Sequence, residues 1–384
     1  MHGLFANGVL AALLLSGALA DHHHHHHNHG SGHSHEGKTN FHKLSRPNAD
    51  FAFALYRNLN AKTNVGKNIF YSPLGISTVL SMVSAGAGGD THSQLCSTLG
   101  YGALNQSQVN EGYENLFHML GHSQENQKLD VGNAVAVRTG FSPLESFLKE
   151  IKHYYSGDIF NDLSEVRPDC KDVFVIFSHF LKGLIEDSLL SKITDQSKIN
   201  RNADFHVDDT TKVQVDMMKR TGYYNIYHDA DNHTTIIMLP YKGTTSMMIV
   251  LPDEGKMKEV EGFISKEHLR HWYIDLYLPK FSISVCACLR DTLKELGITN
   301  AFEDNADFSG ISNETKSKVS KVSHRTSLSV TEMGTEASAI SIAELIYLML
   351  PPSVTIDRPF LVFIMERSTR SILFMGKISN PTLM

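Results

Sequence analysis

The chain is poor in cysteine. Only four cysteines occur in 384 residues, namely Cys96, Cys170, Cys286 and Cys288, which is far too few for a fold held together by disulfides. Cys286 and Cys288 lie two residues apart in a strand-like run, so both side chains face the same side. A redox pair or half of a metal site is one interpretation, but two small apolar side chains in a sheet are the simpler one. Because so few disulfides can form, the stability of the fold must come from a large apolar core.

Basic charge and long apolar runs are also scarce. The 35 Lys and Arg residues are outnumbered by 41 Asp and Glu residues, which gives a net charge of -6 with His neutral. This balance gives no signal for nucleic-acid binding. No segment reaches the roughly 18 uninterrupted apolar residues that a membrane-spanning helix needs. We therefore expect neither a nucleic acid nor a membrane as partner.

The motifs of common enzymes are absent. The sequence contains no G-x-S-x-G, no H-E-x-x-H, no P-loop and no G-x-G-x-x-G after a strand. It has no Cys-x-x-Cys pair with zinc spacing, and its His residues form no recognisable grouping with Ser and Asp. No motif favours an enzyme, a hidden triad is the alternative, and no cofactor is expected.

The first 20 residues have the pattern of a secretory signal peptide. The apolar run Val9–Leu15 has a suitable length, and Ala18–Ala20 supplies the small residues that a signal peptidase needs. A membrane anchor is the alternative, but the run is too short to span a bilayer. The pattern predicts a secreted, extracellular protein. Three sequons then predict glycosylation, at Asn105, Asn232 and Asn313.

Residues 21–40 are predicted to form a disordered His-rich tail, because the segment has almost no apolar side chains. Six imidazoles in a row can bind Zn, Cu or Ni loosely, and they belong to His22, His23, His24, His25, His26 and His27. A solvated tail and a purification tag are the alternatives, so no firm metal site is assigned. The remaining residues, 41–384, form one globular domain.

Helical and strand-like stretches are mixed along this domain. Leu74–Ala87 has the composition of a buried helix, and Glu145–Tyr155 is amphipathic. Thr235–Leu239 and Ser246–Leu251 are typical of strands, and Phe360–Met365 follows near the end. Because the mixture has no βαβ period, the predicted fold class is α+β.

The segment Thr331–Pro352 is unusual, because one face of it would carry only small side chains. Its charges are limited to Glu332, Glu336 and Glu344. Read with the period of two that a strand has, the small face consists of Thr335, Ala337, Ala339, Ser341 and Ala343. Such a strand can slide between two strands already packed on a core without needing a new cavity. A flexible surface loop of small residues is the alternative.

Several motifs occur in a fixed order along residues 41–384. They are Asn68–Pro73, Phe205–Asp208, Val215–Arg220, Leu251–Gly255, Leu278–Phe281, Leu296–Thr299, His324, Glu332–Ala337, Asp357–Phe360 and Phe374–Pro381. With these motifs the chain resembles the serpin family, in particular its alpha-1-antitrypsin type. The resemblance implies three β-sheets, eight or nine helices and an exposed reactive-centre loop at residues 332–352.

The resemblance also implies a mechanism. A target protease cleaves the loop and forms an acyl-enzyme, and the freed loop then inserts as a new strand and distorts the attached protease. The hinge of that movement would comprise Glu332, Gly334, Thr335, Glu336, Ala337, Ser338, Ala339, Ile340 and Ser341. Family spacing places the cleaved bond at Leu348–Met349, and a slip of one residue, to Tyr347–Leu348 or Met349–Leu350, is the alternative. Its apolar residues suit an extracellular serine protease with a hydrophobic primary pocket, of chymotrypsin or elastase type.

Further roles follow from the resemblance alone. Lys280 and Glu332 would form an ion pair where insertion begins, although two exposed charges of little energetic weight are the alternative. Ser72 and His324 would form the shutter hydrogen bonds that control opening of the sheet. Heparin activation is not expected, because Thr91–Gln127 contains no Lys or Arg. A monomer is expected.

Residues 161–200 depart from the family pattern. Val173–Gly183 resembles the central strand of the main sheet, but only Asp162–Asp172 is available for the helix that usually precedes it. This departure favours a second hypothesis, a non-inhibitory carrier or binding protein on the same fold. A third hypothesis is a secreted metal-binding protein that acts through its His-rich tail.

Overall fold

The computed structural model describes ten stretches of the chain, which are residues 37–122, 131–137, 141–160, 174–180, 199–229, 233–240, 244–257, 270–313, 317–330 and 352–383. The predicted signal peptide, the His-rich run at residues 22–27 and the whole of residues 331–351 lie outside the described part.

The helices of the described part lie mainly in the first half of the chain. They are α2 (Gly37–Lys62), α3 (Pro73–Ala85), α4 (Gly89–Thr98), α5 (Gln106–His122), α6 (Glu145–Tyr155), α8 (Arg290–Leu296) and the 3-10 helix η2 (Asn300–Phe302). Thus α2 starts inside the stretch 21–40 that sequence analysis assigns to a tail. None of the described helices combines the length and apolar character that crossing a membrane requires.

The strands occupy most of the second half. They are β1 (Ile69–Tyr71), β2 (Val131–Val137), β3 (Gly157–Phe160), β4 (Phe174–Phe180), β5 (Ile199–His206), β6 (Lys212–Asp229), β7 (Thr234–Pro240), β8 (Thr245–Pro252), β9 (Arg270–Cys288), β10 (Lys321–Val330), β11 (Ser353–Thr355), β12 (Phe360–Glu366) and β13 (Ser371–Ile378). The mixture of helices and strands agrees with the predicted α+β class.

Two long strands join all of these strands into one hydrogen-bonded network. The order is β1-β13-β12-β8-β7-β6-β9-β10-β4-β2-β3, with β11 attached to β9 and β5 attached to β6. The described strands thus form one large mixed sheet, because β6 and β9 are 18 and 19 residues long and each passes from one group of strands into the next. The division into three β-sheets stays a prediction. Six α-helices and one 3-10 helix belong to the described part, against eight or nine expected for the whole chain.

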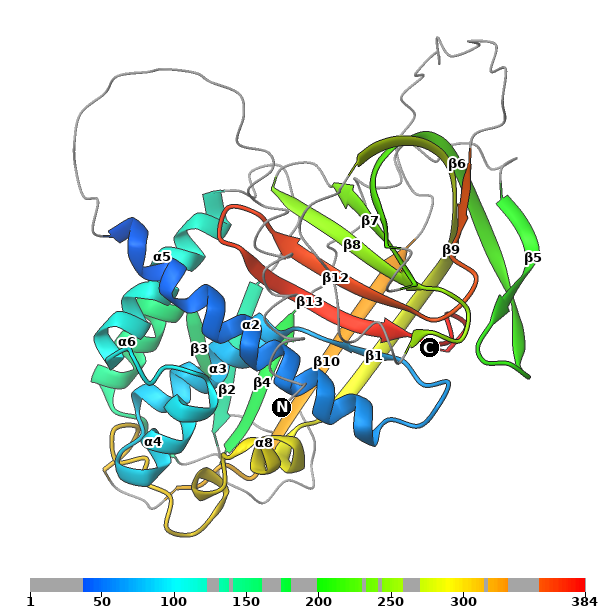
Figure 1. The fold of residues 1–384 in the computed structure, drawn as a ribbon. Helices are drawn as coiled ribbons and strands as arrows, with labels where there is room; N and C mark the ends of the chain where they lie inside the picture. Colours follow the sequence, from blue (N-terminus) through cyan, green and yellow to red (C-terminus); the bar gives the residue numbers. More distant parts are fainter. Residues whose placement is uncertain are drawn as a thin grey trace, which may run out of the picture.

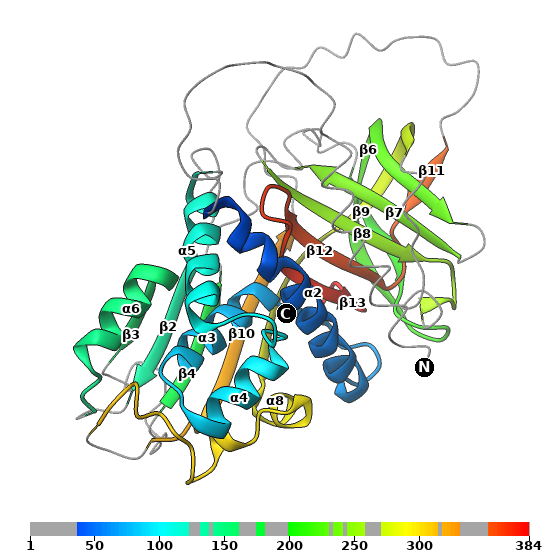
Figure 2. The same cartoon turned by 60° about the vertical axis from the view of Figure 1, so that its left-hand side comes forward.

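Figures 1 and 2 show how these elements are arranged in space. The helices α3, α4, α5 and α6 gather at one end of the molecule, around β2, β3 and β4. At the other end, the strands β5 to β9 and β11 lie together. The strands β12 and β13 cross the molecule between α2 and the β9–β10 pair, and nearly all of their side chains are buried.

The helix α3 is buried along almost its whole length. Every residue from Pro73 to Ser84 is buried, and many of them are small, which lets neighbouring strands and helices approach closely. Sequence analysis predicted this helix at Leu74–Ala87, and the prediction is confirmed to within two residues. The N-terminus of α3 follows β1 directly, and β1 pairs with β13. The start of this helix therefore lies beside the sheet.

The strands β3 and β4 lie on the two sides of β2. The strand β3 pairs in parallel with β2, and β4 pairs with the other edge of β2 in the antiparallel direction. The end of β3 and the start of β4 therefore lie at the same end of β2, on its two sides, about 10 Å apart. The thirteen residues 161–173 that join these two ends lie outside the described part.

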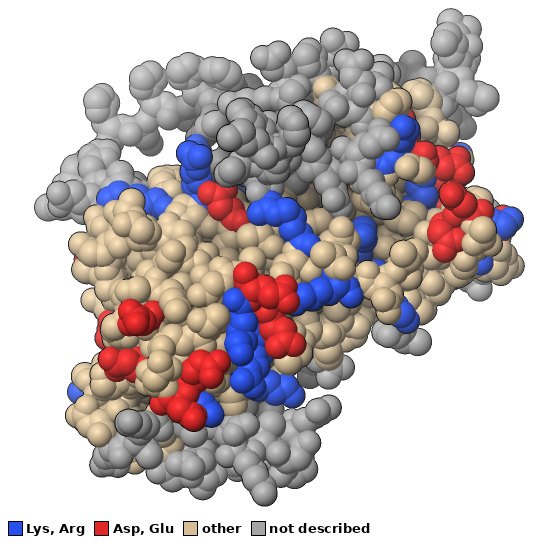
Figure 3. All heavy atoms as spheres, turned by 60° about the horizontal axis from the view of Figure 1, so that its bottom comes forward, with Lys and Arg blue, Asp and Glu red and all other residues tan. Residues whose placement is uncertain are grey.

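Charged side chains of both signs lie next to one another on the surface (Figure 3). Lys62 and Glu295, for example, approach to 2.8 Å, and both are about half exposed. Exposed pairs of this kind contribute little to stability, so the apolar core must hold the fold together.

Gly376 on β13 lies directly against the backbone of β1. A β-carbon at this position would lie 1.9 Å from the backbone oxygen of Ile69 on β1. We expect Gly376→Ala to lower the free energy of unfolding by about 3 kcal/mol or more, because the obstacle is backbone and cannot rotate away. Denaturant unfolding measures this loss. The matched control is Gly102→Ala, whose added carbon meets nothing within 4 Å; an equal loss in both variants would contradict the steric explanation.

Candidate functional site

The candidate site is the line of contact between β10 and β4, which we call the seam. On one side β10 pairs with β9 over eight residues, from Ser323 to Val330. On the other side it pairs in parallel with β4 over five residues, from Lys321 to Arg325. In Figure 1 the orange β10 runs between the yellow β9 and the green β4. Among the described residues, the second half of β10 is thus paired on the β9 side alone.

The strand β10 turns alternate side chains toward the core. The inward side chains are buried and belong to Val322, His324, Thr326, Leu328 and Val330. Two of these five are polar. A polar group buried without a hydrogen bond costs free energy, so each of the two needs a partner beneath the sheet.

His324 receives its hydrogen bond from the start of α3. The backbone N–H of Ser72 donates to Nε2 of His324 over 2.8 Å, and the two residues are 0% and 2% exposed. Since Nε2 accepts this bond, the imidazole carries its hydrogen on Nδ1. The Ser72 hydroxyl has another role, because it accepts a hydrogen bond from the Gly75 N–H and caps α3.

Thr326 makes a second link of the same kind. Its hydroxyl donates to the backbone oxygen of Phe70 on β1 over 2.7 Å. Sequence analysis did not assign this residue to the site. The signal was available, because Thr326 lies two residues after His324 and therefore faces the same side of the strand.

Both ends of the segment that follows β10 are fixed to β9. Val330, at the end of β10, lies opposite Phe281, and Ser353, at the start of β11, lies opposite Asp275. These two positions on β9 are six residues apart, or about 20 Å along a strand. The Asp275 N–H also donates to the Pro352 oxygen over 3.0 Å. The two ends of the segment are therefore held about 20 Å apart on one and the same strand.

Comparison with known proteins identifies the family. A model described as serpin (serine protease inhibitor) matches residues 46–169 and 191–381. The chain belongs to the serpin family. The resemblance found by sequence analysis is thereby confirmed, and so is the prediction that the protein is not an enzyme, because serpins are inhibitors or carriers. The unmatched residues 170–190 include β4, which still pairs with strands on both of its sides.

The relatives of this serpin include both inhibitor-type and carrier-type proteins. An alpha-1-antitrypsin homolog from Cyprinus carpio is 46% identical over 321 residues, which cover 77% of this chain and 86% of the relative. Thyroxine-binding globulin from Homo sapiens is 35% identical over 387 residues, which cover 91% and 92%. The crystal structure of human thyroxine-binding globulin with its hormone superposes with a TM-score of 0.80 and 33% identity, covering 89% of this chain and all of that one.

The structure places some predicted site residues together and leaves others untested. Ser72 and His324 are in contact, as described above. Lys280 lies on β9, next to the residue that faces Val330, but Glu332 lies outside the described residues, so their ion pair stays a prediction. The hinge and the bond Leu348–Met349 also lie outside the described residues.

The predicted glycosylation sites remain predictions. Asn105 and Asn313 are exposed, as an attached glycan requires, and Asn232 lies outside the described residues. The cysteine pair at Cys286 and Cys288 is exposed on β9. Their place in a strand, with both side chains on the same side, is therefore confirmed; the opposite face of β9, with Phe281 and Ile283, is turned to the core.

Register defines the partner of His324 across the seam. His324 lies opposite Ser178 on β4 and opposite Ala287 on β9. These two pairs place His324 at the middle of the stretch of β10 that has a paired strand on each side.

We expect His324→Ala to lower the free energy of unfolding by about 2 to 4 kcal/mol. The substitution leaves the buried Ser72 N–H without its acceptor and opens a cavity. Thermal and denaturant unfolding measure the change. Ser323→Ala is the control, because its side chain lies on the outward face, and it should change stability by less than about 0.5 kcal/mol. Equal effects of the two substitutions would rule out a stabilising role for the Ser72–His324 bond.

Proposed function

We propose that this serpin inhibits an extracellular serine protease by trapping it after cleavage of its own loop. The observation that carries the proposal is the parallel seam between β10 and β4. A strand inserted between two parallel strands, and antiparallel to both, replaces one parallel ladder by two antiparallel ladders. Antiparallel pairing is slightly more stable per residue, and the added ladder satisfies more backbone groups. Insertion would therefore release free energy.

The length of the loop supports the same proposal. The 23 residue steps from Val330 to Ser353 reach roughly 75 Å when extended, whereas their anchors lie about 20 Å apart on β9. Such a loop has ample length to present a cleavage site to a protease. Once cut, its first half remains attached to β10, beside the seam that it would enter.

The sequence of the loop supports insertion without repacking of the core. The side that would face inward carries Thr335, Ala337, Ala339, Ser341 and Ala343, all of which are small. The hinge, the ion pair of Glu332 with Lys280 and the shutter role of Ser72 and His324 form part of the proposal. The hydrogen bond from Ser72 to His324 would hold β10 against β4 until the loop is cut.

Cleavage is proposed at Leu348–Met349. Leu348 would enter the primary pocket of the protease, and an apolar side chain fits the hydrophobic pocket of a chymotrypsin- or elastase-like enzyme. Secretion, which the leader at residues 1–20 predicts, would bring the inhibitor to such enzymes. Glycans at the three sequons and a monomeric state belong to the same proposal.

Mixing the protein with chymotrypsin is expected to give a covalent complex that survives boiling in detergent, because the acyl bond remains intact in the trapped state. Ala339→Arg should be cleaved without forming the complex, since its inward side chain would need a new cavity. Ser338→Arg is the matched control, because its side chain faces outward, and it should still form the complex. Clean cleavage of the unaltered protein would refute the inhibitory proposal.

The identity of residue 348 should decide which protease is trapped. Leu348→Arg is expected to lower the rate of complex formation with chymotrypsin by about 100-fold and to permit complex formation with trypsin, whose pocket holds an Asp. Mass spectrometry of the denatured complex should detect the fragment from Met349 to Met384. If the fragment begins elsewhere, the assigned bond is wrong.

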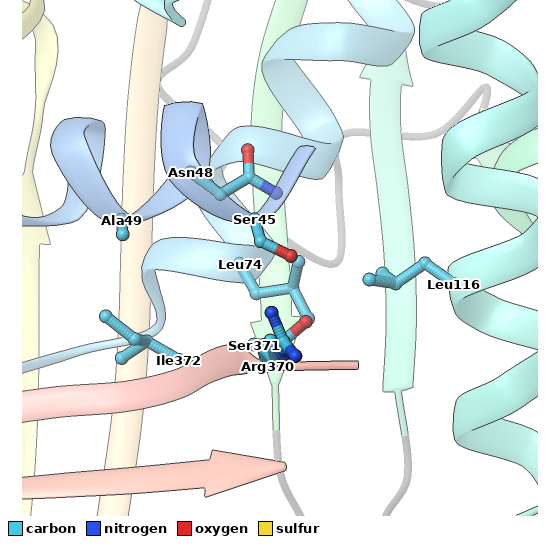
Figure 4. Close-up of a pocket in the computed structure, with 8 residues that line it drawn as sticks. All are labelled: Ser45, Asn48, Ala49, Leu74, Leu116, Arg370, Ser371 and Ile372. Carbon is cyan, nitrogen blue, oxygen red and sulfur yellow. The ribbon is translucent and has the colours of Figure 1, made fainter. Parts of the chain in front are cut away.

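A second candidate is a carrier of a small apolar ligand, favoured by the likeness to thyroxine-binding globulin. A cavity lies between α2, α3, α5 and the β12–β13 turn (Figure 4). Its lining consists of Ser45, Asn48, Ala49, Leu74, Leu116, Arg370, Ser371 and Ile372. The cavity measures about 10 Å³, which admits at most one water, whereas ligand sites measure about 300 to 1,000 Å³. This cavity does not support the carrier function, and equilibrium dialysis with thyroxine tests it directly.

A further inference from the structure

Two thiols lie next to each other on the outer face of β9. Cys286 and Cys288 are both free and exposed. They are two residues apart in one strand, so their side chains point to the same side. Sequence analysis raised a redox pair as one interpretation of this spacing. Neither the proposed inhibition nor the family motifs quoted above use these two residues.

The outer face of β9 around the thiols carries only small side chains. Ser282 and Ser284 are exposed and continue the same row, so this face consists of two hydroxyls followed by two thiols. The intervening Ile283 is buried and packs on the core. A small molecule that approaches the two thiols from solvent therefore meets no bulky side chain of β9.

The backbone at the two thiols is held firmly. The strand β9 pairs with β10 over eight residue pairs, and both cysteines belong to this ladder. Directly after Cys288, the side chain of Leu289 is fully buried, and its N–H donates to the Val322 oxygen over 2.8 Å. The two thiols are therefore held in the extended conformation of a strand.

This conformation opposes a disulfide between the two cysteines. Two residues of extended strand separate the α-carbons of Cys286 and Cys288 by about 6.6 to 6.8 Å. Disulfides usually join α-carbons that are roughly 4.4 to 6.8 Å apart and β-carbons that are about 3.8 Å apart. Since the two Cα–Cβ bonds point the same way, the β-carbons stay too far apart unless the backbone bends. We therefore expect the two thiols to react separately.

Cys96 provides a comparison within the same chain. It lies on α4 and is half-buried, and its sulfur lies 3.7 Å from the Ser84 hydroxyl and 3.5 Å from Nε2 of His92. Burial raises the pKa of the Cys96 thiol. Because the thiolate is the reactive form of cysteine, Cys96 should react much more slowly than the exposed thiols of β9.

We propose that Cys286 and Cys288 form a thiol-modification site, at which each sulfur takes up one small aminothiol as a mixed disulfide. The co-reactant is a low-molecular-weight disulfide of the cystine class. Such disulfides persist in oxidising compartments, to which the predicted leader would bring the chain. The Ser284 hydroxyl, on the same face beside Cys286, is available to hydrogen-bond the charged groups of the adduct. The proposal does not rest on protease inhibition.

The reaction is a thiol–disulfide exchange. The protein thiol loses its proton to solvent, and the thiolate attacks one sulfur of the small disulfide. The S–S bond of the small disulfide breaks, and a new S–S bond joins one half of it to the protein. The other half leaves as a thiolate and takes up a proton from solvent. Each exchange thus consumes one small disulfide and releases one small thiol.

Incubation of the full, reduced chain with cystine at neutral pH tests the site. The remaining thiols are then blocked with an alkylating reagent, and the adducts are located by mass spectrometry without reduction. Trypsin cuts after Lys280 and Arg290, so the two thiols fall in one peptide, residues 281–290, which contains no other cysteine. This peptide should gain the mass of two cysteine residues, and dithiothreitol should remove both.

Variants assign one adduct to each thiol. Cys286→Ser and Cys288→Ser should each leave a single adduct on the peptide 281–290. The matched control is Cys96→Ser, which should leave both adducts in place. In the folded, unaltered protein we expect Cys96 to react at least about tenfold more slowly than the β9 thiols, and this difference should disappear in denaturant.

Several outcomes would overturn the proposal. They are an unmodified peptide, a peptide that loses two hydrogens because an internal disulfide has formed, and a disulfide-linked dimer on a gel without reductant. Equal rates for Cys96 and the β9 thiols in the folded protein would also overturn it. Two adducts that disappear one at a time in the two variants support the site. None of these measurements requires a protease complex, so the inhibitory proposal stands or fails separately.

Discussion

The hydrogen bond from the Ser72 backbone to His324 links the two halves of this serpin. It connects the start of α3, which is buried along its length, to the inward face of β10 at the seam with β4. Thr326 repeats the connection one step further along the strand. Because both bonds are buried, they hold β10 in place over the helical end of the molecule. A movement that separates β10 from β4 would act on the strand that these two hydrogen bonds hold.

The long strand β9 connects this seam to the rest of the sheet. Along one half it pairs with β10, and along the other half it pairs with β6 and carries β11. The loop between β10 and β11 is therefore tied at both ends to one continuous strand. The buried strands β12 and β13 lie on the far side of β6 in the strand order, away from the pairing of β9 with β10.

Periodicity in the sequence was sufficient for the regular elements. The stretches chosen for β7, β8 and β12 and for α6 agree with the structure within one or two residues, because their apolar patterns are strong. The contact of Ser72 with His324 spans 252 residues, and no local pattern encodes such a contact; it was reached only through family resemblance. The helices α4 and α5 were not assigned, because polar side chains dominate both.

The position of the loop in chain order has a mechanical consequence. A cut within residues 331–351 leaves a C-terminal piece that contains β12 and β13, and these two strands are buried between β8 and β1. The severed piece would stay lodged in the body of the protein and would come away only on denaturation. Cleavage at this loop would therefore leave the two pieces associated, and size measurements under native conditions would not detect it.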